Sequence, residues 1–175
     1  MASCTFFGNR DTPEMVTDAL WRVLKRLVVQ EGVDCFYVGN QGAFDDMVIH
    51  TLCRLKQRYP HIACKVVLPY LPSSGAMPRS AAAKMGRRQK TPYVWEQSRA
   101  YYPGTPPETI CPKEVQQAPP RCAILRRNRW MLQQADMVVA FVASPLDDAA
   151  DYCSRARAQG KPVINLFESK VYHRV

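Results

Sequence analysis

The segment Val38-Gly39-Asn40-Gln41-Gly42-Ala43-Phe44-Asp45 decides the fold class of this 175-residue chain. It ends the short apolar run Cys35 to Val38 and precedes a helical pattern of apolar residues that reaches Arg58. A strand that ends in glycine and leads into a helix is typical of an open α/β sheet, whose ligands bind beyond the carboxyl ends of the strands. Glycine lets the backbone approach a ligand closely, and the unpaired N–H groups of the following helix attract anions.

The N-terminus repeats this arrangement in Phe6-Phe7-Gly8-Asn9-Arg10-Asp11, which follows an expected strand over Ser3 to Phe7. Asp11 or Thr12 is expected to cap the next helix, and Gly32 to end it. Both glycine segments therefore predict a nucleotide-like ligand, although they name no reaction.

The rest of the chain continues the alternation of strand and helix. Further strands are expected at Ala63 to Leu68, Met137 to Val142 and Pro162 to Phe167. One helix is expected to begin near Arg121, with Leu125 on its apolar face, and another to cover Asp147 to Gln159. Because no two strands are joined by a hairpin turn, we expect a Rossmann-like, doubly wound sheet of about five mainly parallel strands in the order 3-2-1-4-5. The switch point then lies between the first strand and the Met137 strand.

The middle of the chain breaks this rhythm. Ten of the fourteen prolines lie between Pro69 and Pro120, and proline resists regular structure. The sequence therefore predicts a single domain over 1–175 with a long irregular insertion at about 69–120, within which Arg79 to Lys90 could form a short basic helix. Loops of this length are either lids and binding loops or disordered segments.

The net charge of +9 is concentrated in one stretch. Met47 to Trp95 contains nine Lys or Arg residues and no Asp or Glu, whereas the rest of the chain holds fifteen basic and fifteen acidic residues. Such a stretch attracts phosphates or nucleic acid, but a charge surplus also simply keeps a protein soluble. The candidate nucleic-acid patch consists of Arg79, Lys84, Arg87, Arg88 and Lys90.

Cysteine and histidine usage predicts no metal site. The seven cysteines form no CxxC pair, and the three histidines are scattered without metal-ligand spacing. Buried thiols that behave as small hydrophobes are the expectation. No apolar run approaches the ~20 residues that span a bilayer, and the N-terminus has no signal-peptide pattern. We therefore expect a cytoplasmic protein with no membrane partner.

Four sequence motifs, taken in their order along the chain, resemble those of a known protein family. They are strand-Gly8-Asn9-Arg10, strand-Gly39 to Asp45, an Arg127-Asn128 helix before an apolar strand, and Gly160 to Leu166. Together they resemble the SLOG superfamily, which includes the Smf/DprA DNA-processing proteins and the LONELY GUY (LOG) enzymes. The pattern is most similar to the YpsA-like branch, in which histidine is usual where Asn9 stands. The resemblance covers about two thirds of the chain and leaves out its proline-rich middle.

This resemblance implies a Rossmann-like fold that binds a nucleotide or a nucleotide-derived ligand. The LOG branch hydrolyses nucleoside monophosphates to a free base and a sugar phosphate, using a glycine-rich phosphate loop and a glutamate after the fourth strand. Here the corresponding segment is Ala143 to Asp151, which holds neither the glycines nor the glutamate. A homo-oligomer formed through exposed helix faces is a further implication of the LOG relatives.

The candidate ligand-binding residues lie at the ends of the strands and on the helix before the Met137 strand. Arg10 offers a fork of donors to phosphate oxygens, unless it instead pairs with Asp11 or Asp45. Asp45 is the candidate acid/base or sugar-binding group, unless it serves only the dipole of its helix. Ser144 could orient a phosphate or only cap a helix. The full set is Gly8, Asn9, Arg10, Gly39, Gly42, Ala43, Asp45, Arg127, Asn128 and Ser144.

Three functions remain open from the sequence. The first is binding of a nucleotide or nucleotide-derived small molecule, as in a ligand sensor, with no further cofactor identified. The second is hydrolysis or transfer at an N-glycosidic bond, with Asp45 as the catalytic candidate. The third is single-stranded nucleic-acid binding, as in the Smf/DprA branch.

Overall fold

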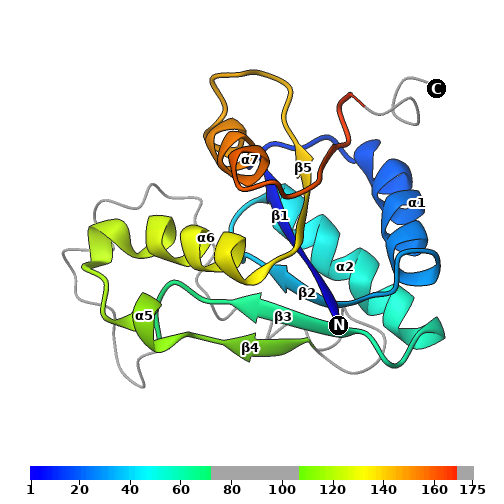
Figure 1. The fold of residues 1–175 in the computed structure, drawn as a ribbon, viewed down its shortest axis with the longest axis horizontal. Coiled ribbons are helices and arrows are strands. Elements are labelled where there is room, and N and C mark those ends of the chain that lie inside the picture. Colours follow the sequence, from blue (N-terminus) through cyan, green and yellow to red (C-terminus); the bar gives the residue numbers. More distant parts are fainter. Residues whose placement is uncertain (72–106, 169–175) are drawn as a thin grey trace.

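A computed structural model describes residues 1–71 and 107–168 of the chain. Its centre is a parallel sheet of six strands in the order β4-β3-β2-β1-β5-β6. The strands are β1 (Ala2–Gly8), β2 (Val33–Val38), β3 (Ala63–Val67), β4 (Glu108–Ile110), β5 (Met137–Phe141) and β6 (Val163–Asn165). β1 and β5 lie side by side at the centre of the sheet, as Figure 1 shows.

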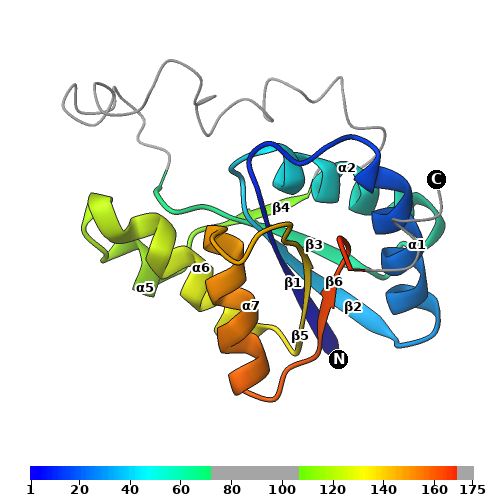
Figure 2. The same cartoon turned by 90° about the horizontal axis from the view of Figure 1, so that it is seen from above.

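Helices cover both faces of this sheet (Figures 1 and 2). On one face lie α1 (Val16–Val29) and α2 (Ala43–Arg58), which pack with the strands into the larger core. On the other face lie α6 (Ala123–Gln134) and α7 (Asp148–Ala158), with the short α5 (Lys113–Gln116) beside α6. A 3₁₀ turn at Pro120–Cys122 leads into α6.

Successive side chains of β1 show why both faces need a cover. Phe6 is 1 % exposed and stacks on Phe36 of β2 within the core under α1 and α2. The next residue, Phe7, points to the opposite face and stacks on Tyr152 of α7, with ring centroids 4.7 Å apart. A strand that is buried on both faces reads as a continuous apolar run, as β1 does.

The predicted Rossmann-like α/β class is confirmed, as is the relative order of the five predicted strands. The switch point lies between β1 and β5, where the sequence placed it, because the chain crosses from β1 toward β2 on one side and β5 joins on the other. The predicted bounds of α2, Ala43 to Arg58, also agree with the structure.

The predicted insertion at 69–120 is too long. β4 pairs with β3 through Lys65 and Glu108, and α5 follows it closely. The sequence analysis missed this sixth strand because it has only three residues, Glu-Thr-Ile, between Pro107 and Pro112. Proline beside a short strand is compatible with an edge position, which β4 occupies. The predicted basic helix at Arg79 to Lys90 lies outside the described residues.

Two predicted helix details are wrong. α1 begins at Val16 after Met15, with no side-chain cap, because the Thr12 hydroxyl instead donates to the Asn9 carbonyl at 2.8 Å. On α6, Leu125 is exposed, whereas the charged Arg127 is buried. Within the two described ranges, no helix combines the length and apolar character that crossing a membrane requires.

Candidate functional site

The loops after β1, β2 and β5 meet at the carboxyl edge of the sheet. The first two are fastened together directly, because the Ala43 N–H donates to the Arg10 carbonyl at 3.0 Å. Gly42 makes this approach possible: its φ is +100°, and an added Cβ would lie 2.8 Å from the Arg10 Cα. Only glycine adopts this backbone region without strain. The β1 loop and the start of α2 therefore form one continuous wall, with Gly8 against the Phe44 ring.

The loop after β5 is held by Asp147. The Asp147 carboxylate accepts hydrogen bonds from the N–H groups of Ala143 (3.1 Å) and Ser144 (3.0 Å) and from the Asn9 side chain. These donors hold the pKa of Asp147 below its usual value, with the Asn9 bond the largest cause. The Asn9 contact ties the β1 loop to the β5 loop across the switch point.

Ser144 lies in this fastened loop but does not cap α7. Its hydroxyl accepts from the Leu146 N–H at 3.2 Å, and α7 begins four residues later, at Asp148. The capping alternative for Ser144 is therefore wrong, whereas phosphate orientation stays a prediction.

The floor of the site contains a buried carboxylate and a buried guanidinium. Asp45 is 9 % exposed and Arg127 is 3 % exposed. Both reach the backbone of Gly39: an added Cβ there would lie 3.0 Å from Arg127 Nη1 and closer still to Asp45 Oδ2. A side chain at position 39 would thus displace one of the two charged groups.

Burial sets the protonation of Asp45. Desolvation raises the pKa of its carboxyl from 3.8 to about 6, against the opposing charge of Arg127 and a hydrogen bond from the Gln41 N–H (2.9 Å). Asp46 raises the pKa further by like-charge repulsion. A carboxyl with a pKa near 6 can exchange a proton close to neutral pH, as acid/base chemistry requires.

Arg127 anchors α6 to the neighbouring strands. Its Nη1 donates to Asn40 Oδ1 (3.0 Å), after β2, and to the Val67 carbonyl (3.3 Å), at the end of β3. Its Nε donates to Asn128 Oδ1 at 2.7 Å, so Asn128 has a partner within the protein. Among residues 1–71 and 107–168, none accepts a hydrogen bond from Nη2.

Arg10 stands differently from Arg127, since its side chain is exposed. No carboxylate of the described residues lies within 4.0 Å of it, so the alternative pairing with Asp11 or Asp45 is not formed there. Among the described residues, Arg10 is thus an exposed cation at this edge that is open to an incoming anion.

The structure thus gathers the candidates from three loops and separates them by role. The loops that meet at the edge contain Asn9, Arg10, Gly39, Gly42 and Ser144, and they are flanked by Gly8 at the end of β1 and Ala43 at the start of α2. Asp45 and Arg127 lie beneath them, and Asn128 supports Arg127. The alternative patch of Arg79, Lys84, Arg87, Arg88 and Lys90 lies outside the described residues.

Sequence reasoning missed three contributors to this edge. Asn40 and the Gln41 N–H bind the buried charges, and Asp147 fastens the β5 loop. The position of Asp147 in the sequence could have drawn attention to it, because an aspartate just before a helix is a favoured capping residue. No feature of the sequence indicated the role of Asn40, since its partner Arg127 is 87 residues away. Within the described part of the chain, no three His, Cys, Asp or Glu side chains gather as metal ligands.

Comparison with known proteins identifies the fold. No protein-family model and no curated protein sequence matches the chain. Among solved structures, it is similar to DNA processing protein A (DprA) from Streptococcus pneumoniae, with 14% identity and a TM-score of 0.59. It is also similar to DNA processing protein A from Helicobacter pylori, whose structure was described for its single-stranded DNA binding mode, with 14% identity and a TM-score of 0.55.

These similarities extend over 93% of this chain but only 49% of the Streptococcus chain and 63% of the Helicobacter chain. The chain therefore spans about half to two thirds of the length of these proteins. At 14% identity these similarities show the fold alone, and it is the Rossmann-like fold that the resemblance implied.

Proposed function

We propose that this chain binds a nucleotide or a nucleotide-derived ligand at the carboxyl edge of its sheet, between the loops after β1, β2 and β5. One observation carries the proposal: these loops are fastened to one another around the exposed Arg10, by the Ala43 to Arg10 bond and the Asn9 to Asp147 bond. Open α/β sheets bind ligands at such a switch point. The finer kinship with the YpsA-like branch is part of this proposal and rests on the glycine segments.

Each polar group has a role in this proposal. Arg10 holds a phosphate, since its guanidinium is exposed and has no described carboxylate partner. The Asn9 side chain, already at the junction of two loops, accepts or donates to a ribose hydroxyl or a base edge. Asp45 and Arg127 lie below Gly39 and shape the floor, with Asp45 as the group that would take or give a proton if a reaction follows binding.

Isothermal titration calorimetry with AMP, GMP and UMP tests the proposal. Arg10→Ala should weaken binding at least tenfold, because a charge-assisted contact to phosphate is lost. Arg22→Ala is the matched control, since Arg22 is an equally exposed arginine on α1, away from this edge. Equal affinity of wild type and Arg10→Ala, or binding of none of the three nucleotides by folded protein, would remove the proposal.

Single-stranded DNA binding is the second candidate. It is supported by the fold shared with DNA processing protein A and by the basic excess of Met47 to Trp95. Fluorescence anisotropy with a labelled oligothymidine should show an affinity that falls steeply with salt, because phosphate contacts release counterions. Reversal of Arg87, Arg88 and Lys90 to Glu should reduce that salt slope. An unchanged slope and affinity would exclude this patch as a DNA-binding surface.

A further inference from the structure

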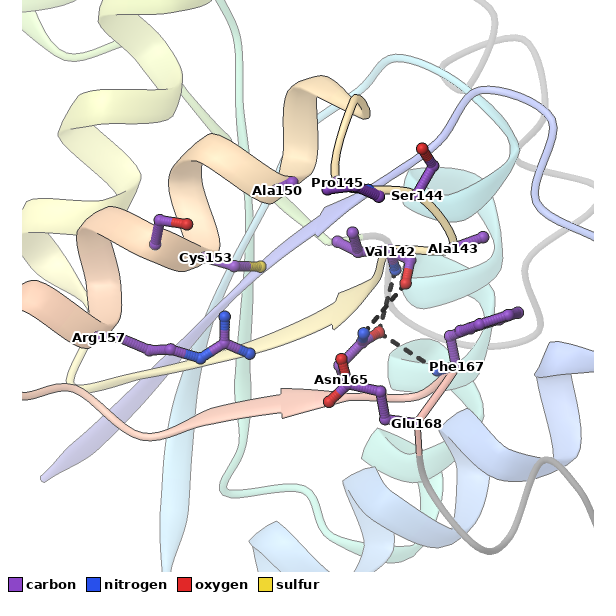
Figure 3. A pocket seen from close by; sticks show the side chains of 11 residues that line it. Val142, Ala143, Ser144, Pro145, Ala150, Cys153, Arg157, Asn165, Phe167 and Glu168 are labelled. Atoms are coloured by element: carbon purple, nitrogen blue, oxygen red, sulfur yellow. Dashed lines mark hydrogen bonds between the residues drawn. The ribbon is translucent and has the colours of Figure 1, made fainter.

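A second cavity lies on the far side of β5 from Asp45 and Arg127. Figure 3 shows it between α7, the loop after β5 and the end of β6. Its volume is about 320 Å³, which falls in the range of small-molecule sites. It shares only Ala143 to Pro145, in the β5 loop, with the edge described above.

Hydrogen bonds and a ring contact hold the walls of this cavity in place. The Asn165 side chain accepts from the Val142 N–H (3.0 Å) and the Phe167 N–H (3.2 Å) and donates to the Val142 carbonyl (3.0 Å). Phe167 in turn packs edge-on against Phe141, with ring centroids 5.9 Å apart. Asp147 also holds the β5 loop, and walls held by contacts within the protein lower the entropic cost of binding.

Small side chains on α7 create the space. Ala150 and Ser154 are one helical turn apart, as are Cys153 and Arg157, and all four line the cavity. The Cys153 thiol is almost fully buried, and desolvation raises its pKa to about 11, so it stays neutral near pH 7. Together with Val142, Pro145 and Phe167 it gives the interior an apolar character.

Two opposite charges flank this apolar interior. Arg157 extends from α7 and Glu168 from the chain after β6 into the same space (Figure 3). Both side chains are exposed, and both act on the Cys153 thiol: Arg157 lowers its pKa and Glu168 raises it. They do not neutralise each other, since no contact within 4.0 Å joins them.

We infer that this cavity binds a small zwitterion of amino-acid size, with its carboxylate on Arg157, its ammonium group on Glu168 and its apolar body against Val142, Ala150 and Phe167. The planar fork of an arginine matches a carboxylate with two parallel hydrogen bonds. A glutamate carboxylate accepts from an ammonium group in the same way. The site is distinct from the nucleotide site proposed above, because neither of its two charged anchors, Arg157 and Glu168, belongs to that edge, although Ala143 to Pro145 contribute to both.

Calorimetric titration of the full chain with L-leucine and L-phenylalanine tests this inference. Saturable binding of at least one of them is expected, at least tenfold weaker in Arg157→Gln and in Glu168→Gln. Leucinol lacks the carboxylate and N-acetyl-leucine lacks the ammonium group, so both should bind at least tenfold more weakly than leucine. Ala150→Phe should abolish binding by filling the cavity.

Arg155→Gln is the matched control, because Arg155 lies on the same helix but pairs with Asp151 at 2.7 Å and does not line the cavity. It should leave the affinity unchanged. Two results would overturn the inference: no saturable binding of either amino acid up to about 10 mM, beyond the weak millimolar range, or binding that Ala150→Phe and Arg157→Gln leave intact. Because AMP is not a probe here, neither result bears on the nucleotide proposal.

Discussion

The polar groups at the amino and carboxyl ends of the sheet differ in their hydrogen bonding and burial. At the amino end, Ser3 of β1 and Asp136, just before β5, are joined by several hydrogen bonds. Asp136 Oδ2 accepts from the Ser3 N–H and hydroxyl, both at 2.8 Å, and the Asp136 N–H donates to the Ser3 carbonyl at 3.0 Å. The Ser3 hydroxyl also donates to the Gln134 carbonyl at 3.0 Å. These bonds join two strands that are more than 130 residues apart in the chain.

The charged groups at the carboxyl end have different surroundings. Asp45 is buried with one hydrogen bond from a described residue, and Arg10 is exposed with no carboxylate partner among them. At the amino end the hydrogen bonds lower the pKa of Asp136, whereas at the carboxyl end burial raises the pKa of Asp45 to about 6. The amino end therefore stabilises the fold, whereas burial of the Asp45 charge at the carboxyl end costs stability. Such a cost is typical of a binding site.

The largest expected effect follows removal of the cation that balances Asp45. Arg127→Met keeps most of the side-chain volume but leaves a buried carboxylate without its opposing charge and cuts three hydrogen bonds. Hydrogen bonds made by a charged group contribute about 1.5–3 kcal/mol each, so the loss of three of them should cost at least about 3 kcal/mol. Urea denaturation should show this loss, whereas Arg129→Met, at an exposed position on the same helix, should change the stability by less than about 0.5 kcal/mol. Equal losses in both variants would contradict the assigned role of Arg127.

Removal of the buried charge itself should have the opposite sign. The pKa of Asp45 is raised from 3.8 to about 6, so the native state binds its proton more tightly than the unfolded state does. Its contribution to stability is then present below pH 4 and is lost as the pH rises toward 6. At about 1.4 kcal/mol per pKa unit, a shift from 3.8 to about 6 means that Asp45→Asn should stabilise the protein by about 3 kcal/mol at pH 7.

The pH profile sharpens this prediction. Between pH 4 and pH 6 the wild-type free energy of unfolding should fall relative to that of Asp45→Asn, and above pH 6 the difference should stay constant. If Asp45→Asn were less stable than wild type at pH 7, the attraction between the Asp45 charge and Arg127 would have to exceed the desolvation cost of burying that charge. Any release of free base from a nucleotide that survives in Asp45→Asn would exclude Asp45 as its acid or base.

A smaller loss is expected at the amino end. Ser3→Ala removes the hydroxyl that donates to Asp136 and to Gln134, which should cost about 2 kcal/mol. The Ser3 donors lower the pKa of Asp136 below 3.8, so its contribution is present above that value and is lost as the pH falls further. In Ser3→Ala, acid unfolding should therefore begin at a higher pH than in wild type. Unchanged acid unfolding, followed by circular dichroism, would contradict the assignment.

The sequence predicted the fold well because the fold depends on local patterns. Strand-glycine-helix junctions such as Val38 to Ala43 and the continuous apolar runs of β1 and β5 appear within a few neighbouring residues. The strand order then follows from the handedness of parallel crossovers. The sequence analysis did not predict β4, because three residues with a single apolar side chain show no alternation of apolar and polar residues.

The candidate site was predictable only in part, for a physical reason. The glycines and Asp45 stand out in sequence because they belong to the turns that make the edge. The partners that decide their chemistry come from distant segments: Arg127 reaches Val67 across 60 residues, and Asn9 reaches Asp147. Burial of Arg127 was likewise hidden, since it lies beside the exposed Arg126 and Arg129 in a run of similar residues.

The smallest expected effect concerns Gly160-Lys161-Pro162, part of the pattern on which the family resemblance rests. The Lys161 ammonium group donates to the carbonyls of Leu132 (2.6 Å) and Ala135 (2.7 Å), at the carboxyl end of α6. A cation there satisfies free carbonyls and opposes the helix dipole. Lys161→Met keeps the apolar stem, so it should cost about 1 kcal/mol and leave nucleotide affinity unchanged. With that result, Gly160-Lys161-Pro162 would contribute to stability, like the amino end of the sheet. A loss of nucleotide binding by folded Lys161→Met would instead assign the segment to the binding site.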